Sequence, residues 1–256
     1  MIAKRKEKLG IALIAVLALL VVAGILLQNP VAQDLNYHLF KDARTLFYIP
    51  NFWNVLSNIL FLLVGLLGLY RTLIIKTLNI KKEIKASYIL LFAGITLVAF
   101  GSGYYHLWPD NQTLVWDRLP MTIAFMALFS IIISEYISVR IGKALLLPFI
   151  ILGMASVLYW YFSELNGMGD LRYYAIVQFF PMLAMPIIFI FFNSQYSNTR
   201  VYWLLLVVYI AAKVFEHFDE EIYNTLGIIS GHSLKHIVVA LGLYILLISY
   251  TKRTAK

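Results

Sequence analysis

The sequence predicts an all-α membrane protein, a bundle of helices that crosses the bilayer several times. Of its 256 residues, 61% are hydrophobic and only 13% are charged, and the mean hydropathy is +0.81. A soluble domain has about 45–50% apolar and about 25% charged residues. The composition therefore excludes a water-soluble globule, and it also excludes a disordered chain, which needs low hydrophobicity.

Eight segments are suitable membrane spans, because a helix needs about 20 mostly apolar residues to cross a bilayer. They are 9–28, 52–70, 87–107, 120–138, 144–162, 173–193, 201–218 and 227–250. We expect residues 1–30 to form an uncleaved signal anchor, since their apolar stretch is longer than the roughly 7–15 residues of a cleaved signal. Residues 31–256 would then form a seven-helix core.

The basic residues predict the orientation. With the N-terminus in the cytoplasm, 15 of the 21 Lys and Arg residues fall on the cytoplasmic side, in 4–8, 71–85, 140–143, Arg200 and 252–256. This asymmetry follows the positive-inside rule. We therefore expect both termini in the cytoplasm. The basic N-terminus and the absence of Cys are compatible with a bacterial inner membrane, which is the expected location. No nucleic-acid partner is expected despite the net charge of +8, because the basic residues lie between apolar spans.

Ionisable residues inside spans are candidates for function, and several of them are predicted at the outer ends of their spans. His232 and His236 are four residues apart, so on a helix they share one face, with their Cβ atoms about 5–6 Å apart. Such a pair suits two corners of a tetrahedral zinc site, where a third histidine such as His106 leaves the fourth corner for water. Asp117 could take a proton from that water. Ser102 precedes His106 by four residues and shares its face.

Histidine is the natural ligand for a borderline metal here, because the chain has no Cys. Disulfide scaffolds and Cys-ligated sites are excluded for the same reason. An alternative interpretation remains open, in which these histidines only cap helices or bind interfacial water.

Metal-bound histidines usually give their other ring nitrogen to an acceptor. Glu216 and Asp219 are candidates for that role, and Lys213 lies three residues before Glu216, where it can pair with it. The alternative is an interfacial ion-pair cluster that only anchors the helix. His217 points away from Glu216 on a helix, and no partner can be named for His38.

Two further predictions concern residues outside this group. Glu135 is expected to reach water at the inner end of its span. An interfacial aromatic belt is expected from Tyr104, Tyr105, Trp108 and Trp116.

These motifs resemble the alkaline ceramidase family. That family belongs to a superfamily of seven-span membrane hydrolases with adiponectin-receptor-type and GPI-lipid-remodelling proteins. The superfamily pattern has Ser and Asn in the first core helix, a Ser-x-x-x-His, a following Asp, and a His-x-x-x-His in the last helix. The matching stretches here are Phe52 to Asn58, Ser102 to His106, Asp117, and His232 to His236. The resemblance covers roughly residues 50–250.

The resemblance implies a zinc-dependent hydrolase that cleaves the amide bond of ceramide-like lipids to release a fatty acid and a sphingoid base. It implies that Zn²⁺ is bound by His106, His232 and His236. Asp117 would be the general base, and Ser102 would steady the oxyanion. Ser57 and Asn58 would support the ligands or pack helices. Animal members bind calcium through acids before the first core helix, but Asn51 stands at that position, which argues against a calcium site.

Three other functions compete with this one. A lipid-ester hydrolase and a receptor-like protein with a structural zinc would use the same ligands, although Asp117 and Ser102 favour catalysis. A retinal protein would need Lys235 as its Schiff base, and that residue lies at a helix end rather than at the middle of the bilayer.

Overall fold

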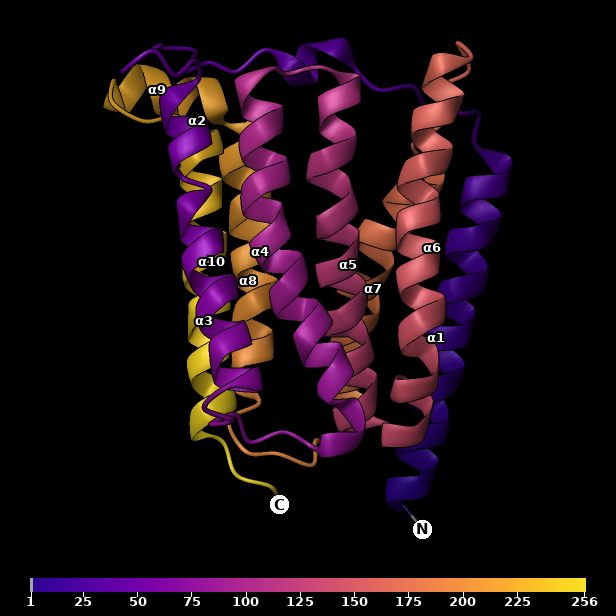
Figure 1. Ribbon diagram of the computed structural model, residues 1–256. Helices are drawn as coiled ribbons and strands as arrows, with labels where there is room; N and C mark the ends of the chain where they lie inside the picture. The colour runs from indigo at the N-terminus through magenta and orange to yellow at the C-terminus, as the bar shows by residue number, and fades with distance from the viewer. Residues whose placement is uncertain (1) are drawn as a thin grey trace.

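A computed structural model describes residues 2–256 of the chain as a bundle of long, roughly parallel and antiparallel helices (Figure 1). The described residues contain no β-strand, only two isolated bridges. The all-α prediction is confirmed. The helices are α1 (Ile2–Leu27), α2 (Phe52–Leu56), α3 (Ile59–Leu73), α4 (Lys85–Leu107), α5 (Asn111–Tyr136), α6 (Val139–Leu165), α7 (Arg172–Phe191), α8 (Arg200–His217), α9 (Asp219–Leu226) and α10 (Gly231–Lys252), with short 3-10 turns at η1 (Leu35–His38) and η2 (Lys82–Ile84).

The protein is an integral membrane protein by the length and composition of its helices. Within residues 2–256, seven helical segments are apolar enough to cross a membrane, and α8 with α9 would be an eighth. These two helices meet at a bend of 75°. Alone, α8 carries three charged residues, Arg200, Lys213 and Glu216, within its 18 residues, and it does not qualify as a span by itself.

The helix α5 forms the centre of the bundle and α1 its outside. The apolar window of α5 is 72% buried and that of α1 only 6%. Helix α5 packs against α4, α6 and α7, whereas α1 packs chiefly on α7 (Figure 1). After the charged residues 4–8 at its start, the side chains that α1 leaves exposed are apolar, as expected for a helix that faces lipid.

Both chain ends lie at one end of the bundle, and the segment between α1 and α2 runs across the other end (Figure 1). That crossing segment is tied to the bundle beneath it. The amide of Leu171 donates to the carbonyl of Val31 at 2.8 Å, and Lys41 pairs with Glu220 at 2.8 Å. The segment therefore covers the end of the bundle that lies away from the termini.

The predicted start of the fourth span was wrong by about two turns. Helix α5 begins at Asn111, where Asp110 and Thr113 form a reciprocal capping box. The predicted span began at residue 120, where the apolar run starts. Here Pro120 lies inside α5, so Asp117 is held on a regular helix and not at its first turn.

The prediction that Glu135 reaches water was also wrong. Its side chain is buried, with 1% of the residue exposed. At the end of the bundle that carries the termini, Arg253 pairs with Glu135 at 2.7 Å. The hydroxyls of Tyr88 and Tyr202 also donate to this carboxylate. We call Tyr88, Glu135, Tyr202, Tyr250 and Arg253 the closing cluster. It fastens the end of the chain to the middle of the bundle.

Candidate metal centre

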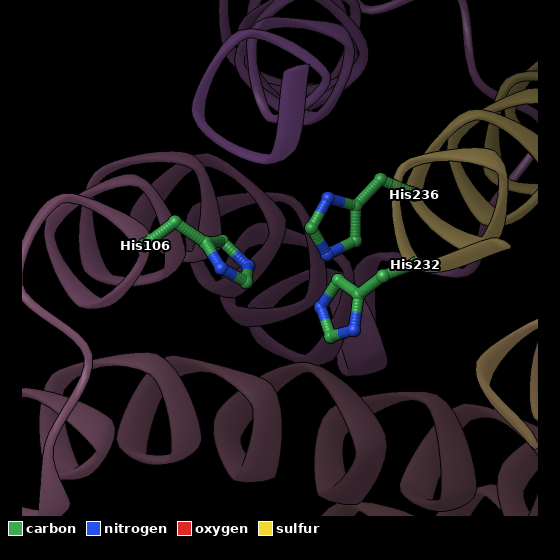
Figure 2. Close-up of side chains that lie close together, drawn as sticks. All are labelled: His106, His232 and His236. Atoms are coloured by element: carbon green, nitrogen blue, oxygen red, sulfur yellow. The ribbon is translucent and has the colours of Figure 1, made fainter. Parts of the chain in front are cut away.

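Three histidines from two helices meet inside the bundle, at the end opposite the termini. His106 comes from the last turn of α4, and His232 and His236 come from the first two turns of α10. One nitrogen of each ring lies within 4.8 Å of a nitrogen of each other ring. The three rings point toward one another (Figure 2), and all three residues are buried, with 1–6% exposed.

The start of α10 fixes two of these side chains. Ser230 caps the helix by accepting a hydrogen bond from the amide of Ser233. Asp219 accepts from the amide of His232 at 2.6 Å. At Gly231 an added Cβ would lie 2.1 Å from the carbonyl oxygen of Phe215, so only glycine lets α10 begin this close to α8. Local capping and one close backbone contact therefore place the histidine pair.

A polar group on α2 and the turn after it supports the histidines from the other side. The Oγ of Ser57 lies 2.8 Å from Nδ1 of His236 and 3.1 Å from the carbonyl oxygen of Asn54. Since a hydroxyl has one proton to donate, donation to Asn54 makes His236 Nδ1 the donor in the other contact. This arrangement leaves Nε2 of His236 unprotonated and able to bind a metal.

Two asparagines extend this support to the other helices. Asn51 donates to the backbone carbonyl of His106 at 2.8 Å, and Asn54 accepts from the hydroxyl of Ser233 at 2.6 Å. Asn58 donates to the carbonyl of Asn54 at 2.7 Å. The sequence analysis identified Ser57 and Asn58 but gave Asn51 and Asn54 no such role. The sequence offered one signal for these two residues: Asn54 lies within the stretch from Phe52 to Asn58, and Asn51 directly precedes that stretch.

The donor set fits a metal of the zinc type. Among the described residues, the buried Nδ1 of His106 has no hydrogen-bond partner, and an unpaired buried polar atom is costly unless a ligand satisfies it. Three neutral imidazoles at one point are the ligands that zinc takes in catalytic sites with an open position. The ring of Phe40 packs at 4.6 Å from the His106 ring and 4.9 Å from the His232 ring, which limits water on that side.

Asp117 and Ser102 lie at the same cavity as the histidine cluster. Both are buried, at 9% and 2% exposure, and the Ser102 hydroxyl lies next to the Asp117 carboxyl. Gly101 allows this approach, because an added Cβ there would lie 1.9 Å from the carbonyl oxygen of Trp116. The close packing of α4 on α5 thus brings a carboxylate and a hydroxyl beside the three imidazoles.

The cavity has a volume of about 260 Å³. Its wall near His232 and His236 includes the polar residues Asp117, Glu216 and Lys235, and farther along α5 and α10 it becomes apolar, with Leu128 and Leu243. A cavity with one polar and one apolar part suits an amphiphilic molecule whose polar group lies at the histidines.

Glu216 and Asp219 have partners other than the histidine rings. Glu216 pairs with Lys213 at 2.6 Å and with Lys235 at 2.8 Å, so the predicted pair of Lys213 with Glu216 is confirmed. Asp219 accepts from backbone amides, at 2.6 Å from that of His232 and at 3.3 Å from that of Lys41. The ion-pair cluster left open by the sequence is thus present at the edge of the cavity.

Tyr37 closes this edge from the crossing segment. Its hydroxyl donates to Glu216 at 3.3 Å. Burial raises the pKa of Tyr37 well above its usual value, and the nearby Glu216 carboxylate raises it further. The phenol therefore stays protonated and serves as a donor.

The remaining histidines and aromatic residues lie outside the cluster. His217 is exposed, whereas His38 lies 3.0 Å from the hydroxyl of Tyr105 and 2.9 Å from Asn111. Tyr105 is 1% exposed, so its place in an interfacial belt was wrong. The other three residues of that belt, Tyr104, Trp108 and Trp116, are 44–59% exposed.

Comparison with known proteins gives one match that covers most of the chain. The family model described as Ceramidase matches residues 41–255. Comparison with curated proteins gives no match. The matched range includes all three histidines, Ser102 and Asp117, and it leaves out α1.

Proposed function

The chain belongs to the ceramidase family, hydrolases that act on ceramide, and we propose that it cleaves the amide bond of ceramide-like membrane lipids with the help of a zinc ion. The products would be a fatty acid and a sphingoid base. The observation that carries this proposal is the meeting of three buried imidazoles within 4.8 Å of one another, beside a cavity that also contains Asp117 and Ser102.

In this proposal His106, His232 and His236 hold the ion through one ring nitrogen each. Such an ion would polarise the amide carbonyl and lower the pKa of a bound water to about 7. Ser57 keeps the His236 ring oriented through its Nδ1 contact of 2.8 Å, and oriented ligands bind metals more tightly.

Asp117 serves as the general base that takes a proton from the attacking water and passes it to the leaving amine. Its carboxyl lies at the cavity wall next to Ser102. The Ser102 hydroxyl donates to the oxygen that becomes negative as the carbonyl is attacked. Both roles require side chains that face the cavity, and a closed structural zinc site would need neither of them. This requirement favours an enzyme over a receptor-like protein with a structural metal.

The membrane supplies the substrate. We propose that the acyl chain lies in the apolar part of the cavity, near Leu128 and Leu243, with the amide at the histidines. The distribution of basic residues supports cytoplasmic termini, and the histidine cluster would then lie near the outer leaflet of a bacterial inner membrane. Residues 1–30 would form the separate signal anchor, and residues 31–256 the hydrolase core.

The test is a metal analysis of the purified protein combined with a fatty-acid-release assay on ceramide. We expect one zinc per chain and release of fatty acid that stops after chelation and returns with added zinc. Matched substrates with an ester in place of the amide decide between amidase and esterase. Zinc without any release would favour the receptor-like alternative, and release that is unaffected by chelation would contradict the proposal.

A further inference from the structure

The cavity contains a second polar feature, the guanidinium of Arg118, which the proposed reaction does not use. Arg118 comes from α5 and is 7% exposed. Its Nη1 is buried and has no hydrogen-bond partner among residues 2–256. No carboxylate of the described residues lies within 4.0 Å of it, since the ion pairs join other residues. A charged group inside a membrane-spanning helix without a partner calls for a ligand.

The guanidinium is held in a fixed position. Nη2 donates to the side-chain oxygen of Gln33 at 2.6 Å. The guanidinium carbon lies 4.2 Å from the ring centre of Trp160 and 4.7 Å from that of Tyr174. These contacts fix the plane of the guanidinium while Nη1 stays free to donate. An arginine oriented before binding loses less entropy when a ligand arrives.

The position of Arg118 separates it from the histidines. Its stacking partners come from α6 and α7, whereas the histidines come from α4 and α10. Arg118 and Tyr174 line the same cavity as His232 and His236. The lining also includes Tyr209 of α8, whose buried hydroxyl has no partner either. The cavity therefore contains two donor groups, apart from the histidine cluster, that no protein atom among the described residues uses.

The charge of the cavity points to the nature of the ligand. Its lining contains three cationic side chains, Arg118, Lys213 and Lys235, and two carboxyl groups, Asp117 and Glu216. Glu216 pairs with both lysines, and Asp117 forms no ion pair with Arg118 within 4.0 Å, so the guanidinium has no carboxylate partner among the described residues. A carboxylate, phosphate or sulfonate would accept from a guanidinium through charge-assisted hydrogen bonds.

We propose that Arg118, with Tyr209 of the same cavity lining as a second donor, forms a binding site for an acidic group of the lipid ligand, in the cavity that the histidine cluster shares. The acidic group is either an anionic head group of the substrate or the carboxylate of the released fatty acid. This inference rests on the proposed function for the lipid nature of the ligand, but the site itself is a property of the cavity.

Equilibrium binding to the full-length protein in phosphatidylcholine nanodiscs tests this proposal, after treatment with a chelator so that no substrate is consumed. Three probes are compared: a ceramide, the same ceramide with phosphate on its primary hydroxyl, and the free fatty acid of the same chain length. We expect at least one acidic probe to bind the wild type about 10-fold or more tightly than the neutral ceramide, a difference of about 1.4 kcal/mol.

Three variants assign that preference to the guanidinium. Arg118→Met keeps the length of the side chain and should bring the preference to within about 2-fold. Arg118→Lys keeps the charge, loses the planar fork, and should retain part of the preference. Arg172→Gln is the matched control, since Arg172 lies at the same end of the bundle and pairs with Asp170. It should retain the preference in full.

The outcomes are distinct. Dependence on Arg118 for the phosphorylated ceramide identifies a head-group site, and dependence for the fatty acid alone identifies a site for the product carboxylate. Equal binding of all three probes to the wild type, or a preference that survives in Arg118→Met, overturns the proposal. If the preference depends on Arg118 but zinc-loaded protein releases no fatty acid from any lipid, the proposed function fails and the anion site stands.

Discussion

The two ends of the bundle each bury a set of charged and polar side chains, and they do so in opposite ways. In the closing cluster the carboxylate of Glu135 accepts from Arg253, Tyr88 and Tyr202. The guanidinium of Arg253 also donates to Tyr88 and to the carbonyl of Asn79. No side-chain atom of this cluster is buried without a partner. Because its hydrogen-bonding groups are all paired within the protein, the closing cluster serves to stabilise the fold.

At the histidine end of the bundle, by contrast, some buried polar atoms lack a hydrogen-bond partner. Within residues 2–256, four buried side-chain atoms have no partner, and they belong to Asn58, His106, Arg118 and Tyr209. Arg118 and Tyr209 line the cavity, His106 belongs to the histidine cluster, and Asn58 lies in the polar group beside it. Buried polar groups cost free energy when they are unpaired, so atoms left free together at one cavity mark the place where ligands bind. Buried polar groups that are all paired thus indicate a structural role, and buried polar groups left unpaired at a cavity indicate a binding role.

The largest change expected from this comparison is loss of the metal. His236→Ala removes one of three ligands and should reduce zinc from one ion per chain to a small fraction, with fatty-acid release falling to background. Elemental analysis and the release assay measure both. His217→Ala is the control, because His217 is exposed and outside the cluster. Zinc retained in full by His236→Ala would remove this residue from the ligand set.

Breaking the closing cluster should affect stability instead. Arg253→Met leaves the Glu135 carboxylate buried without its cation, a change that typically costs about 3–5 kcal/mol. The midpoint of thermal unfolding in detergent should fall, while the zinc content of the folded fraction stays the same. Adding Glu135→Leu should recover part of the loss. An unchanged midpoint would show that this pair does not stabilise the fold.

Ser102→Ala should separate chemistry from metal binding. Loss of one donor to a developing oxyanion lowers kcat by about 10²–10³-fold, and because Ser102 is not a ligand the zinc content should not change. Steady-state kinetics on ceramide, with the metal content measured on the same sample, test this expectation. A loss of zinc that parallels the loss of rate would mean that Ser102 acts on the metal site and not on the oxyanion.

The smallest effect concerns the support of the ligands. Ser57→Ala removes the contact with His236 Nδ1 and should weaken zinc affinity by about 10–100-fold, measured by competition with a chelator of known affinity. Thr72→Val serves as a control, since the buried Thr72 hydroxyl donates only to the carbonyl of Gly68 within α3. Equal affinity in the Ser57 variant and the wild type would show that Ser57 does not orient the ring.

The sequence was sufficient for residues whose partners are close in the chain or fixed by helix period. His232 and His236 share a helix face by spacing alone, and the pairing of Lys213 with Glu216 follows from the same rule. The long apolar runs predicted most of the helices. The start of α5 was missed because the apolar run begins near residue 120, whereas the capping box at Asp110 lets the helix begin earlier.

Contacts between distant segments could not be predicted in this way. Glu135 is buried because Arg253 reaches it from the end of the chain, 118 residues away. Asn54 meets Ser233 across 179 residues. No role could be assigned to Arg118 from the sequence, since neither its stacking on Trp160 nor its unpaired Nη1 can be inferred from spacing. Such features depend on which helices pack together, and one sequence does not specify that packing.

The central claim is that His106, His232 and His236 bind one zinc ion and leave a position open. X-ray absorption at the zinc edge of the purified protein measures this ligand set directly. We predict three imidazole nitrogens at about 2.0–2.1 Å and one further oxygen ligand. A protein that binds no zinc, or a spectrum with fewer than three imidazoles, would contradict the claim.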